Sequence, residues 1–346
     1  MTRRDRIELA VTAALVAVAA VCHYASLGHV VTFVLAAVAL AALARLVGTA
    51  TEQLGARLGS GGAGVVQSAL GNLPELFIAL FALRQGLDNV VQAALVGSIL
   101  ANSVLVLGIA FTVGGLKNGT QRFDSSRARL VSTLTMLAAA TMAVPSLAHA
   151  FHTPAAPHGH ALSLVCAGVL LAVFVLTLPS FLSSAAHEEH APARWSPVTT
   201  WIVLAVAGTA AAFTSAWFVD ALTPAIHALH MSEEFAGLVI VAIAGNAVEN
   251  VVGVQLAARN RPDFAISVIL NSSLQVALAL TPVLVFVSLF FATQLTLVFP
   301  TLLALVLLIS SILGALIVDD GESTWQEGAI LVGFYVVIAA SFWWGT

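Results

Sequence analysis

Two short segments of the chain place a glutamate inside a long apolar run, after a glycine and an asparagine. Residues 71–75 are Gly-Asn-Leu-Pro-Glu and residues 245–249 are Gly-Asn-Ala-Val-Glu. Glu75 lies about 12 residues into its apolar run, which is roughly 18 Å along a helix, and Glu249 lies about 15 residues into its own. A carboxylate surrounded by hydrocarbon is costly unless it is protonated, paired or bound to a cation. The motifs therefore predict two acids that are neutralised by protons or by a metal ion.

The two motifs belong to a longer internal repeat. The position numbers of Glu75 and Glu249 differ by the same offset as those of Ser98 and Ser272 (249 − 75 = 272 − 98 = 174). Each copy thus has a Gly-Asn-x-x-Glu motif followed, at an identical spacing, by a serine with an amide side chain nearby. Two matching spacings at one offset indicate a duplicated structural unit.

The residue types in these segments supply oxygen ligands. Gly71 and Gly245 loosen the helix locally, and Pro74 removes an amide donor and frees a carbonyl oxygen of the preceding turn. Broken backbone at membrane depth is tolerated where it lines a cavity, and its carbonyls can coordinate an ion. Carboxylates, amides, hydroxyls and carbonyls together are the ligand set of a hard cation such as Ca²⁺.

Two neighbouring carboxylates would also couple cation binding to proton binding. Desolvation and mutual repulsion both raise the affinity of Glu75 and Glu249 for protons, so we expect them to titrate as a coupled pair. One divalent cation or two protons neutralise the charge of such a site, but the cation and the protons together would leave it with an excess of positive charge. Mutually exclusive occupancy is what an antiporter requires, and charge balance predicts two protons for each divalent cation.

Structural roles for the same residues compete with these functional ones. Glu75 and Glu249 could form a polar pair that only holds two helices together. Asn72 and Asn246 could serve as interhelical hydrogen-bonding residues, which are common in membrane proteins. The duplicated context at matching depth favours the functional interpretation.

The composition is that of a protein immersed in lipid. Of 346 residues, 60% are hydrophobic and 9% are charged, and the mean hydropathy is +1.00. Soluble domains carry roughly 25% charged residues, so the excess apolar surface must face lipid. The small net charge of −4 and the few basic residues argue against a nucleic-acid partner. We therefore predict an all-α integral membrane protein.

Apolar runs of about 20 residues, the length that spans a bilayer, divide the chain. The eleven predicted transmembrane helices lie near residues 7–25, 29–47, 63–84, 90–114, 128–150, 161–182, 198–220, 234–258, 264–290, 295–317 and 326–344.

The basic residues give the predicted topology a direction. With the N-terminus in the cytoplasm, twelve of the 13 Lys and Arg residues fall in cytoplasmic loops or at cytoplasmic helix ends, and only Arg84 does not. This distribution follows the positive-inside rule. We expect a multi-pass protein of a bacterial inner membrane with a cytoplasmic N-terminus.

The odd number of helices predicts two inverted repeats, a recurrent transporter architecture. Residues 1–28 would form an N-terminal transmembrane helix, 29–182 the first five-helix repeat and 198–346 the second. Residues 183–197 would form a cytoplasmic linker, which includes the polar stretch His187–His190.

At these residues the chain resembles the calcium/proton exchanger family of the cation/calcium antiporter superfamily. The resemblance covers nearly the whole chain and is carried by residues 50–52, 71–86 (GNLPELFIALFALRQG), 97–108 (GSILANSVLVLG), 232–235, 245–249 and 272–282 (SSLQVALALTP). It implies that Glu75 and Glu249 bind both the cation and the protons. Their implied neighbours at the metal site are Asn72, Asn246, Ser98, Ser272, Gln275, Gly71 and Gly245.

Two departures from the family pattern bear on function. The second family motif commonly has His directly after the glutamate, whereas this chain has Asn250. The family linker is usually longer and acidic, whereas here it is reduced to His187–His190. The first departure bears on proton handling and ion selectivity, and the second on calcium sensing through the linker.

The sequence therefore predicts a secondary transporter that exchanges cytosolic Ca²⁺ for protons by alternating access. An exchanger for Na⁺, K⁺ or Mn²⁺ of the same architecture is the nearest alternative. A channel would conduct only downhill, and an intramembrane hydrolase would need a nucleophile with a base or paired metal ligands, for which no convincing set is present. We expect no cofactor and no catalytic residue. The partners are Ca²⁺, protons and the lipid bilayer, and a homo-oligomer is left open.

Overall fold

The computed structural model describes the backbone of residues 1–185 and 193–345, and the side chains of these residues except 58–69, 180–185 and 248–249. The predicted linker residues His187–His190 lie outside the described residues. The chain forms two compact units, each built from two stretches of sequence. One unit comprises Met1–Ala82 and Val173–His230, and the other comprises Leu83–Ala172 and Met231–Thr346.

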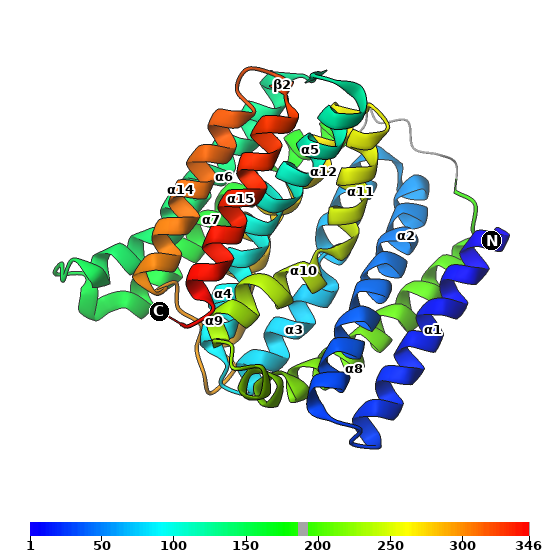
Figure 1. Cartoon of the computed structure of the whole chain (residues 1–346), viewed down its shortest axis with the longest axis horizontal. Helices are drawn as coiled ribbons and strands as arrows, with labels where there is room; N and C mark the ends of the chain where they lie inside the picture. The colour runs from blue at the N-terminus through cyan, green and yellow to red at the C-terminus, as the bar shows by residue number, and fades with distance from the viewer. Residues whose placement is uncertain (186–192, 346) are drawn as a thin grey trace. The chain divides into compact units, whose positions relative to one another are not determined.

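The first unit is a helical bundle around an apolar core. Its elements are α1 (Arg3–Tyr24), α2 (His29–Leu70), α8 (Pro197–Leu229), the greater part of α3 (Leu73–Arg84) and the end of α7 (Gly159–Ala185) (Figure 1). Helices α2 and α8 pack along one another with Leu43, Val47 and Ala207 buried between them. The rings of Phe33 and Phe218 stack with centroids 4.8 Å apart.

The start of α8 is attached to α1 and α2 through Trp195, which is buried. The indole Nε1 donates to Oδ2 of Asp5 at 2.9 Å, and the backbone N–H of Trp195 donates to Oε1 of Gln53 at 3.2 Å. The guanidinium of Arg57 donates to the carbonyl of Trp195. These bonds fix the chain where it leaves the predicted linker.

The second unit contains the first part of α7, up to Ala172, the remaining helices and a two-stranded sheet. Its elements are α4 (Asp88–Leu100), η1 (Ala101–Val106), α5 (Leu107–Asn118), β1 (Gln121–Arg122), α6 (Ser125–Ala150), η2 (Ala156–His158), α9 (Glu233–Phe235), η3 (Ala236–Val241), α10 (Ala242–Gly245), α11 (Ala247–Ala258), α12 (Pro262–Gln275), η4 (Val276–Leu280), α13 (Thr281–Ser288), α14 (Thr301–Ile317), β2 (Glu322–Ser323) and α15 (Trp325–Phe342). Segments η1, η3 and η4 are π-helical, and η2 is a 3₁₀ turn.

The backbone repeats at the same offset as the sequence. Helices α3 and α11 are related by the offset found in the motifs at their first residues (247 − 73 = 174) and at their last (258 − 84 = 174). Helices α4 and α12 begin at Asp88 and Pro262, which the same offset relates. Gly86 and Asn260, which precede them at equivalent positions, both have positive φ, of 77° and 57°. The duplication detected in the motifs therefore extends to helix ends and turns, while the inverted orientation of the halves remains a prediction.

Two helix boundaries differ from the prediction. The backbone is helical from His29 through Leu70, across the expected loop at 48–62, because residues 50–58 are mostly good helix formers despite their polarity. The last but one helix begins at Thr301 rather than near residue 295, since Pro300 holds an extended conformation before it.

The extended segment before α14 is buried, and polar side chains satisfy its backbone. Gln92 Nε2 donates to the Thr296 carbonyl at 2.9 Å, and Ser146 Oγ donates to the Leu297 carbonyl at 2.9 Å. The Phe299 N–H donates to Ser146 Oγ at 2.8 Å. These bonds replace the intrahelical bonds that the apolar run 295–299 would otherwise form.

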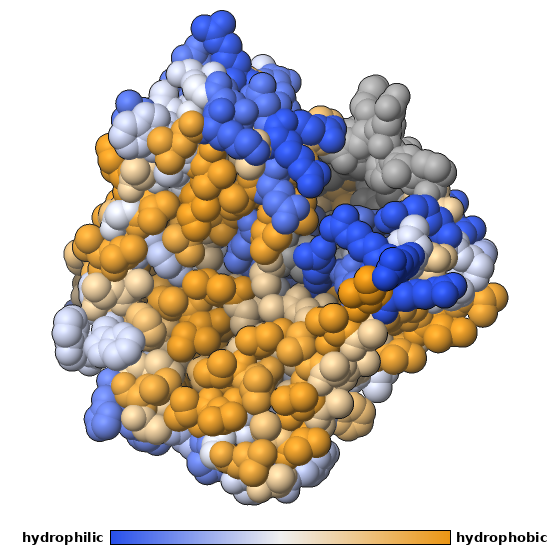
Figure 2. Space-filling view, turned by 45° about the vertical axis from the view of Figure 1, so that its right-hand side comes forward, coloured by the Kyte–Doolittle hydropathy of each residue, from blue (hydrophilic) through white to orange (hydrophobic). Residues whose placement is uncertain are grey.

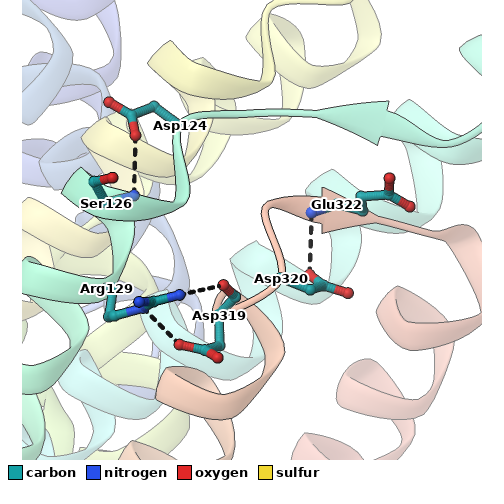
Figure 3. Close-up of polar contacts among 6 residues, drawn as sticks. All are labelled: Asp124, Ser126, Arg129, Asp319, Asp320 and Glu322. Atoms are coloured by element: carbon teal, nitrogen blue, oxygen red, sulfur yellow. Dashed lines mark hydrogen bonds and ion pairs between the residues drawn. The ribbon is translucent and has the colours of Figure 1, made fainter.

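Two loops of the second unit are joined by the small sheet and by ion pairs. Strand β1 pairs antiparallel with β2, and Arg122 Nε lies 3.0 Å from Glu322 Oε1. Arg129 Nε lies 2.6 Å from Asp319 Oδ1, and Arg129 also donates to the Asp319 carbonyl (Figure 3). The α5–α6 loop is thereby tied to the α14–α15 loop.

The surface of the protein is suited to lipid. Hydrophobic residues cover much of the face drawn in Figure 2, and large apolar side chains such as Phe290, which is 89% exposed, face outward. Among the described residues, eight helices are long and apolar enough to cross a membrane, or nine if the bent pair Glu233–Gly245 and Asn250–Ala258 is one span. The chain is an all-α multi-pass membrane protein, and the number eleven remains a prediction.

Candidate functional site

The second glutamate motif lies at a break in a helix of the second unit. Helix α10 ends at Gly245 and α11 begins at Ala247, and the axes of Glu233–Gly245 and Asn250–Ala258 differ by 63°. Asn246 lies between them with φ −101° and ψ 20°. At Gly245, where the sequence predicts local loosening, the helix therefore bends by 63°, and Asn246 has a backbone conformation outside the regular helix.

Asn246 is the centre of a buried network of amides and hydroxyls. Its Nδ2 donates to Ser98 Oγ at 3.0 Å and to the Ala242 carbonyl at 3.1 Å. Its Oδ1 accepts from Asn102 Nδ2 at 3.2 Å and from Ser272 Oγ at 3.3 Å. Asn102 Nδ2 also donates to Ser272 Oγ at 3.0 Å. The network therefore joins three chain segments: α4 with η1, the break before α11, and α12.

One oxygen of this network has no hydrogen-bond donor. Asn102 is 0% exposed, and its Oδ1 accepts no hydrogen bond from any described residue. A buried amide oxygen without a donor is destabilising, because it has lost its hydration and gained nothing in return. Such an oxygen is suited to coordinating a cation, which needs an electron pair rather than a proton.

Each serine of the network precedes a π-helical segment. Segment η1 begins at Ala101, three residues after Ser98, and η4 begins at Val276, four residues after Ser272. Single π turns often lie at functional sites, since the extra residue in the turn re-aims neighbouring side chains. The equivalent placement in both copies is a second feature, besides the broken helices, that the repeat shares in the backbone.

Glycines bring α4 close to the broken helix. A Cβ atom on Gly97 would lie 2.5 Å from Leu238 Cα, and one on Gly237 would lie 2.8 Å from Ala93 Cβ. Both distances are far below contact, so neither position has room for a side chain. Small residues at such crossings let helix backbones approach closely. The close approach brings Ser98 within reach of Asn246.

The first glutamate motif lies at a similar break in the first unit. Helix α2 ends at Leu70 and α3 begins at Leu73, with Pro74 in the first turn, where a missing N–H donor costs nothing. Pro74 therefore starts a helix rather than kinking one. Glu75 follows it and is buried, at 6% exposure, in the N-terminal turn, where the helix dipole favours an anion. Leu73 and Phe77 on either side of it pack against the α2–α8 core.

The structure brings some of the predicted site residues together. Asn246, Ser98 and Ser272 share one network, and Asn102, which is not among the predicted site residues, is bonded to two of them. Gln275, the half-buried last residue of α12, makes no hydrogen bond to any described residue.

The two glutamates themselves are not both described. The side chain of Glu249 lies outside the described residues, and Gly71, Asn72 and Glu75 belong to the first unit, whereas Gly245 and the amide network belong to the second. The meeting of Glu75 with Glu249 therefore stays a prediction.

Comparison with known families places the chain among membrane transporters. The family described as "Sodium/calcium exchanger protein" matches residues 28–183 and 199–344, which is most of the chain. The chain belongs to this family.

Several individual proteins are similar over nearly their full length. The chain is 35% identical over 322 residues to a Ca²⁺/H⁺ antiporter, ChaA, of Bacillus subtilis, covering 90% of this chain and 92% of that protein. It is 30% identical over 344 residues to a Ca²⁺/H⁺ antiporter of Synechocystis, covering 92% of each. The structure of native YfkE superposes with a TM-score of 0.84 at 32% identity, covering 97% of this chain and 99% of that one. The transporter class and the resemblance to calcium/proton exchangers are thereby confirmed.

The close crossing of α4 and η3 gives a first prediction. Replacing Gly97 with Ala should push α4 away from Leu238, separate Ser98 from Asn246 and lower ion transport at least tenfold, because about 1.4 kcal/mol of lost interaction already corresponds to a factor of ten. Transport assays in proteoliposomes would measure this. Gly208→Ala is the matched control, since a Cβ atom there meets nothing within 4 Å. Equal activity of the two variants would contradict the role of the crossing.

Proposed function

We propose that the chain is a secondary antiporter that exchanges cytosolic Ca²⁺ for protons across the membrane. The observation that carries this proposal is the unpartnered oxygen of Asn102 in a buried amide and hydroxyl network at the helix break beside the second glutamate motif. The names of the similar proteins from Bacillus subtilis and Synechocystis, both Ca²⁺/H⁺ antiporters, support the choice of ions.

The proposed cation site combines charged and neutral oxygens. Glu75 and Glu249 supply the charge that balances a divalent cation, and Asn102 Oδ1 supplies a neutral ligand. Asn246 already accepts two hydrogen bonds through Oδ1, so its main part is to orient Asn102 and Ser272. Ca²⁺ takes six to eight oxygens at about 2.3–2.6 Å, and the remaining ligands would come from the other predicted neighbours or from water. Those neighbours are Asn72, Ser98, Ser272, Gln275 and the carbonyls at Gly71 and Gly245.

Exchange follows from competition at the two carboxylates. With Ca²⁺ bound, both glutamates are ionised, and their charges are balanced by the metal. When Ca²⁺ leaves, the two negative charges in a poorly solvated site repel each other, and each gains a proton. Since the cation and the protons exclude each other, a proton gradient drives Ca²⁺ in the opposite direction.

Alternating access is proposed to expose this site to one side of the membrane at a time. The two stretches matched by the family, 28–183 and 199–344, support a division into the repeats 29–182 and 198–346. The recurrence of α3 and α4 as α11 and α12 at one offset supports it as well. Inverted repeats give two related conformations, one open to each side. The distribution of the basic residues supports a cytoplasmic N-terminus.

Exchange of Na⁺, K⁺ or Mn²⁺ is the alternative within the same architecture. Asn250, directly after Glu249, has a buried Oδ1 that accepts no hydrogen bond from any described residue. A second neutral oxygen near the glutamate suits several hard cations. Proton flux in proteoliposomes that responds to micromolar Ca²⁺ would support the calcium assignment, and flux that responds only to a monovalent cation or to Mn²⁺ would replace it.

The glutamates provide the second prediction. Glu75→Gln and Glu249→Gln should each abolish Ca²⁺ uptake into inverted vesicles driven by a proton gradient, because each removes one of the two charges that balance the cation. Glu322→Gln is the control, since it loses only a partly exposed ion pair with Arg122, of a kind worth about 0–1 kcal/mol. Normal uptake by either site variant would refute the assignment of that glutamate.

The third prediction concerns the neutral ligand. Asn102→Val, which introduces the residue found at the repeat-related position 276, should raise the KM for Ca²⁺ about tenfold, since a ligand and two donated hydrogen bonds are lost. Ser103→Ala is the control, because the Ser103 hydroxyl bonds only to the Ile99 carbonyl of its own helix. An unchanged KM in Asn102→Val would exclude the Asn102 oxygen from the site.

The fourth prediction follows from the competition itself. Lowering the pH on the side from which Ca²⁺ enters should raise the KM for Ca²⁺ and leave the maximal rate nearly constant, since protons occupy the same carboxylates. Initial rates of Ca²⁺ uptake would measure this, with the pH varied on the side from which Ca²⁺ enters and held constant on the opposite side. A fall in maximal rate at constant KM would indicate that protons act elsewhere.

A further inference from the structure

The helix that carries Glu249 has its C-terminal end held by a side chain from another loop. Gln121, on strand β1, is 3% exposed and points its carboxamide at the end of α11. Its Nε2 donates to the Ala257 carbonyl at 3.0 Å and to Asn260 Oδ1 at 2.9 Å. The last carbonyls of a helix have no partner within the helix, so Gln121 satisfies one that would otherwise be orphaned.

Neighbouring residues fit this contact closely. Asn118 Nδ2 donates to the same Ala257 carbonyl at 3.2 Å. Asn260 has a φ of +57°, which ends α11 and directs its side chain to Gln121. A Cβ atom on Gly114 would collide with Gln121 Oε1, so the carboxamide lies against the backbone of α5 at this glycine. The glycine leaves room for the carboxamide in the position from which it bonds to the end of α11.

Helix α11 is consequently held by amide side chains at both ends. At its N-terminal end the chain is broken, and Asn246 fixes it to α4, η1 and α12. At its C-terminal end Gln121 and Asn118 fix it to the loop after α5. Helix α11 has 12 residues between a break and a turn, and it packs along α5 and α12, with Gly253 close against Ile269. The two sets of hydrogen bonds add directional polar contacts at both of its ends to this apolar packing.

We propose that Gln121 is a positioning residue for Glu249. This inference rests on the proposed function, in which Glu249 binds the cation. Gln121 lies at the opposite end of α11 from the network, and its hydrogen bonds fix the position, along its axis, of the helix that carries Glu249. This amide contact is present in one half only, because the repeat-related position (121 + 174 = 295) is the buried Leu295, which has no side-chain amide.

Replacing Gln121 with Met tests the inference, since Met keeps the length and removes the amide. Hydrogen–deuterium exchange of the purified protein without Ca²⁺ should be faster in residues 250–258 and unchanged in α15. The KM for Ca²⁺ in proteoliposomes should rise about three- to tenfold, the equivalent of one or two hydrogen bonds, with a smaller change in maximal rate. A defect in folding alone would instead lower the maximal rate and leave the KM unchanged.

Two further variants make the test specific. Arg129→Gln breaks the ion pair, drawn in Figure 3, between the start of α6 and Asp319 in the α14–α15 loop, and it should leave both readouts unchanged. Asn260→Gly should fold, because glycine readily adopts the left-handed backbone found at this position. It removes only one of the two acceptors of Gln121, so hydrogen–deuterium exchange in residues 250–258 and the KM for Ca²⁺ should rise less than in Gln121→Met. It also provides the test if Gln121→Met does not fold.

The outcomes separate this inference from the proposed function. The positioning role would be overturned if hydrogen–deuterium exchange in residues 250–258, or the KM for Ca²⁺, were unchanged in both Gln121→Met and Asn260→Gly. If the wild-type protein exchanged no Ca²⁺ at all, the proposed function would fail. Even then, faster hydrogen–deuterium exchange confined to α11 in Gln121→Met would support the attachment of the helix by Gln121.

Discussion

Hydrocarbon supplies no hydrogen-bond partners, so each polar group at membrane depth needs a partner inside the protein. The break at Gly245–Asn246 places such groups within an apolar unit, and Asn246, Asn102 and two serines satisfy one another almost completely. The remaining Asn102 oxygen is the exception. The amide donors of the network are used and one acceptor is left over, which supports the proposal that a cation binds there. The close glycine crossing and the π turns follow from the need to bring these side chains together.

The two halves of the protein share a backbone plan but differ in their side chains. The ends of α3 recur in α11 at the offset of the sequence repeat, and the positive φ of Gly86 recurs at Asn260. A π-helical segment follows Ser98 in one copy and Ser272 in the other, one residue out of this register. At equivalent positions, however, Asn102 corresponds to Val276 and Gln121 to Leu295. One copy therefore has amide side chains at positions 102 and 121, and the other has apolar side chains at the equivalent positions 276 and 295.

Much of this arrangement could be predicted from the sequence because its cause is local. A glycine and an asparagine inside an apolar run indicate a broken helix, and the breaks at Gly71–Asn72 and Gly245–Asn246 are present. The resemblance to the calcium/proton exchangers implies that Asn246, Ser98 and Ser272 belong to one site, and the hydrogen bonds join them. The meeting of the two glutamates stays a prediction, because it depends on how the units come together rather than on either motif.

Other features depend on contacts between distant segments and left no local signal. Gln121 lies in a segment whose sequence is that of an ordinary polar loop, and only the folded chain brings it to the end of α11. The run 295–299 is apolar enough for a helix, yet Ser146 and Gln92 bind its backbone in an extended form. Gln275 is one of the predicted ligands, but it ends α12 just before η4 and forms no bond in the network.

The most direct test of the account is the number of protons released when Ca²⁺ binds to the purified protein. Titration calorimetry in buffers of different ionisation enthalpy, at a pH where the empty site is protonated, measures this number without any transport step. The account predicts two protons released for each Ca²⁺ bound, and no release of this kind in a variant with both Glu75→Gln and Glu249→Gln. Tight Ca²⁺ binding by the wild-type protein with no release of protons would contradict it.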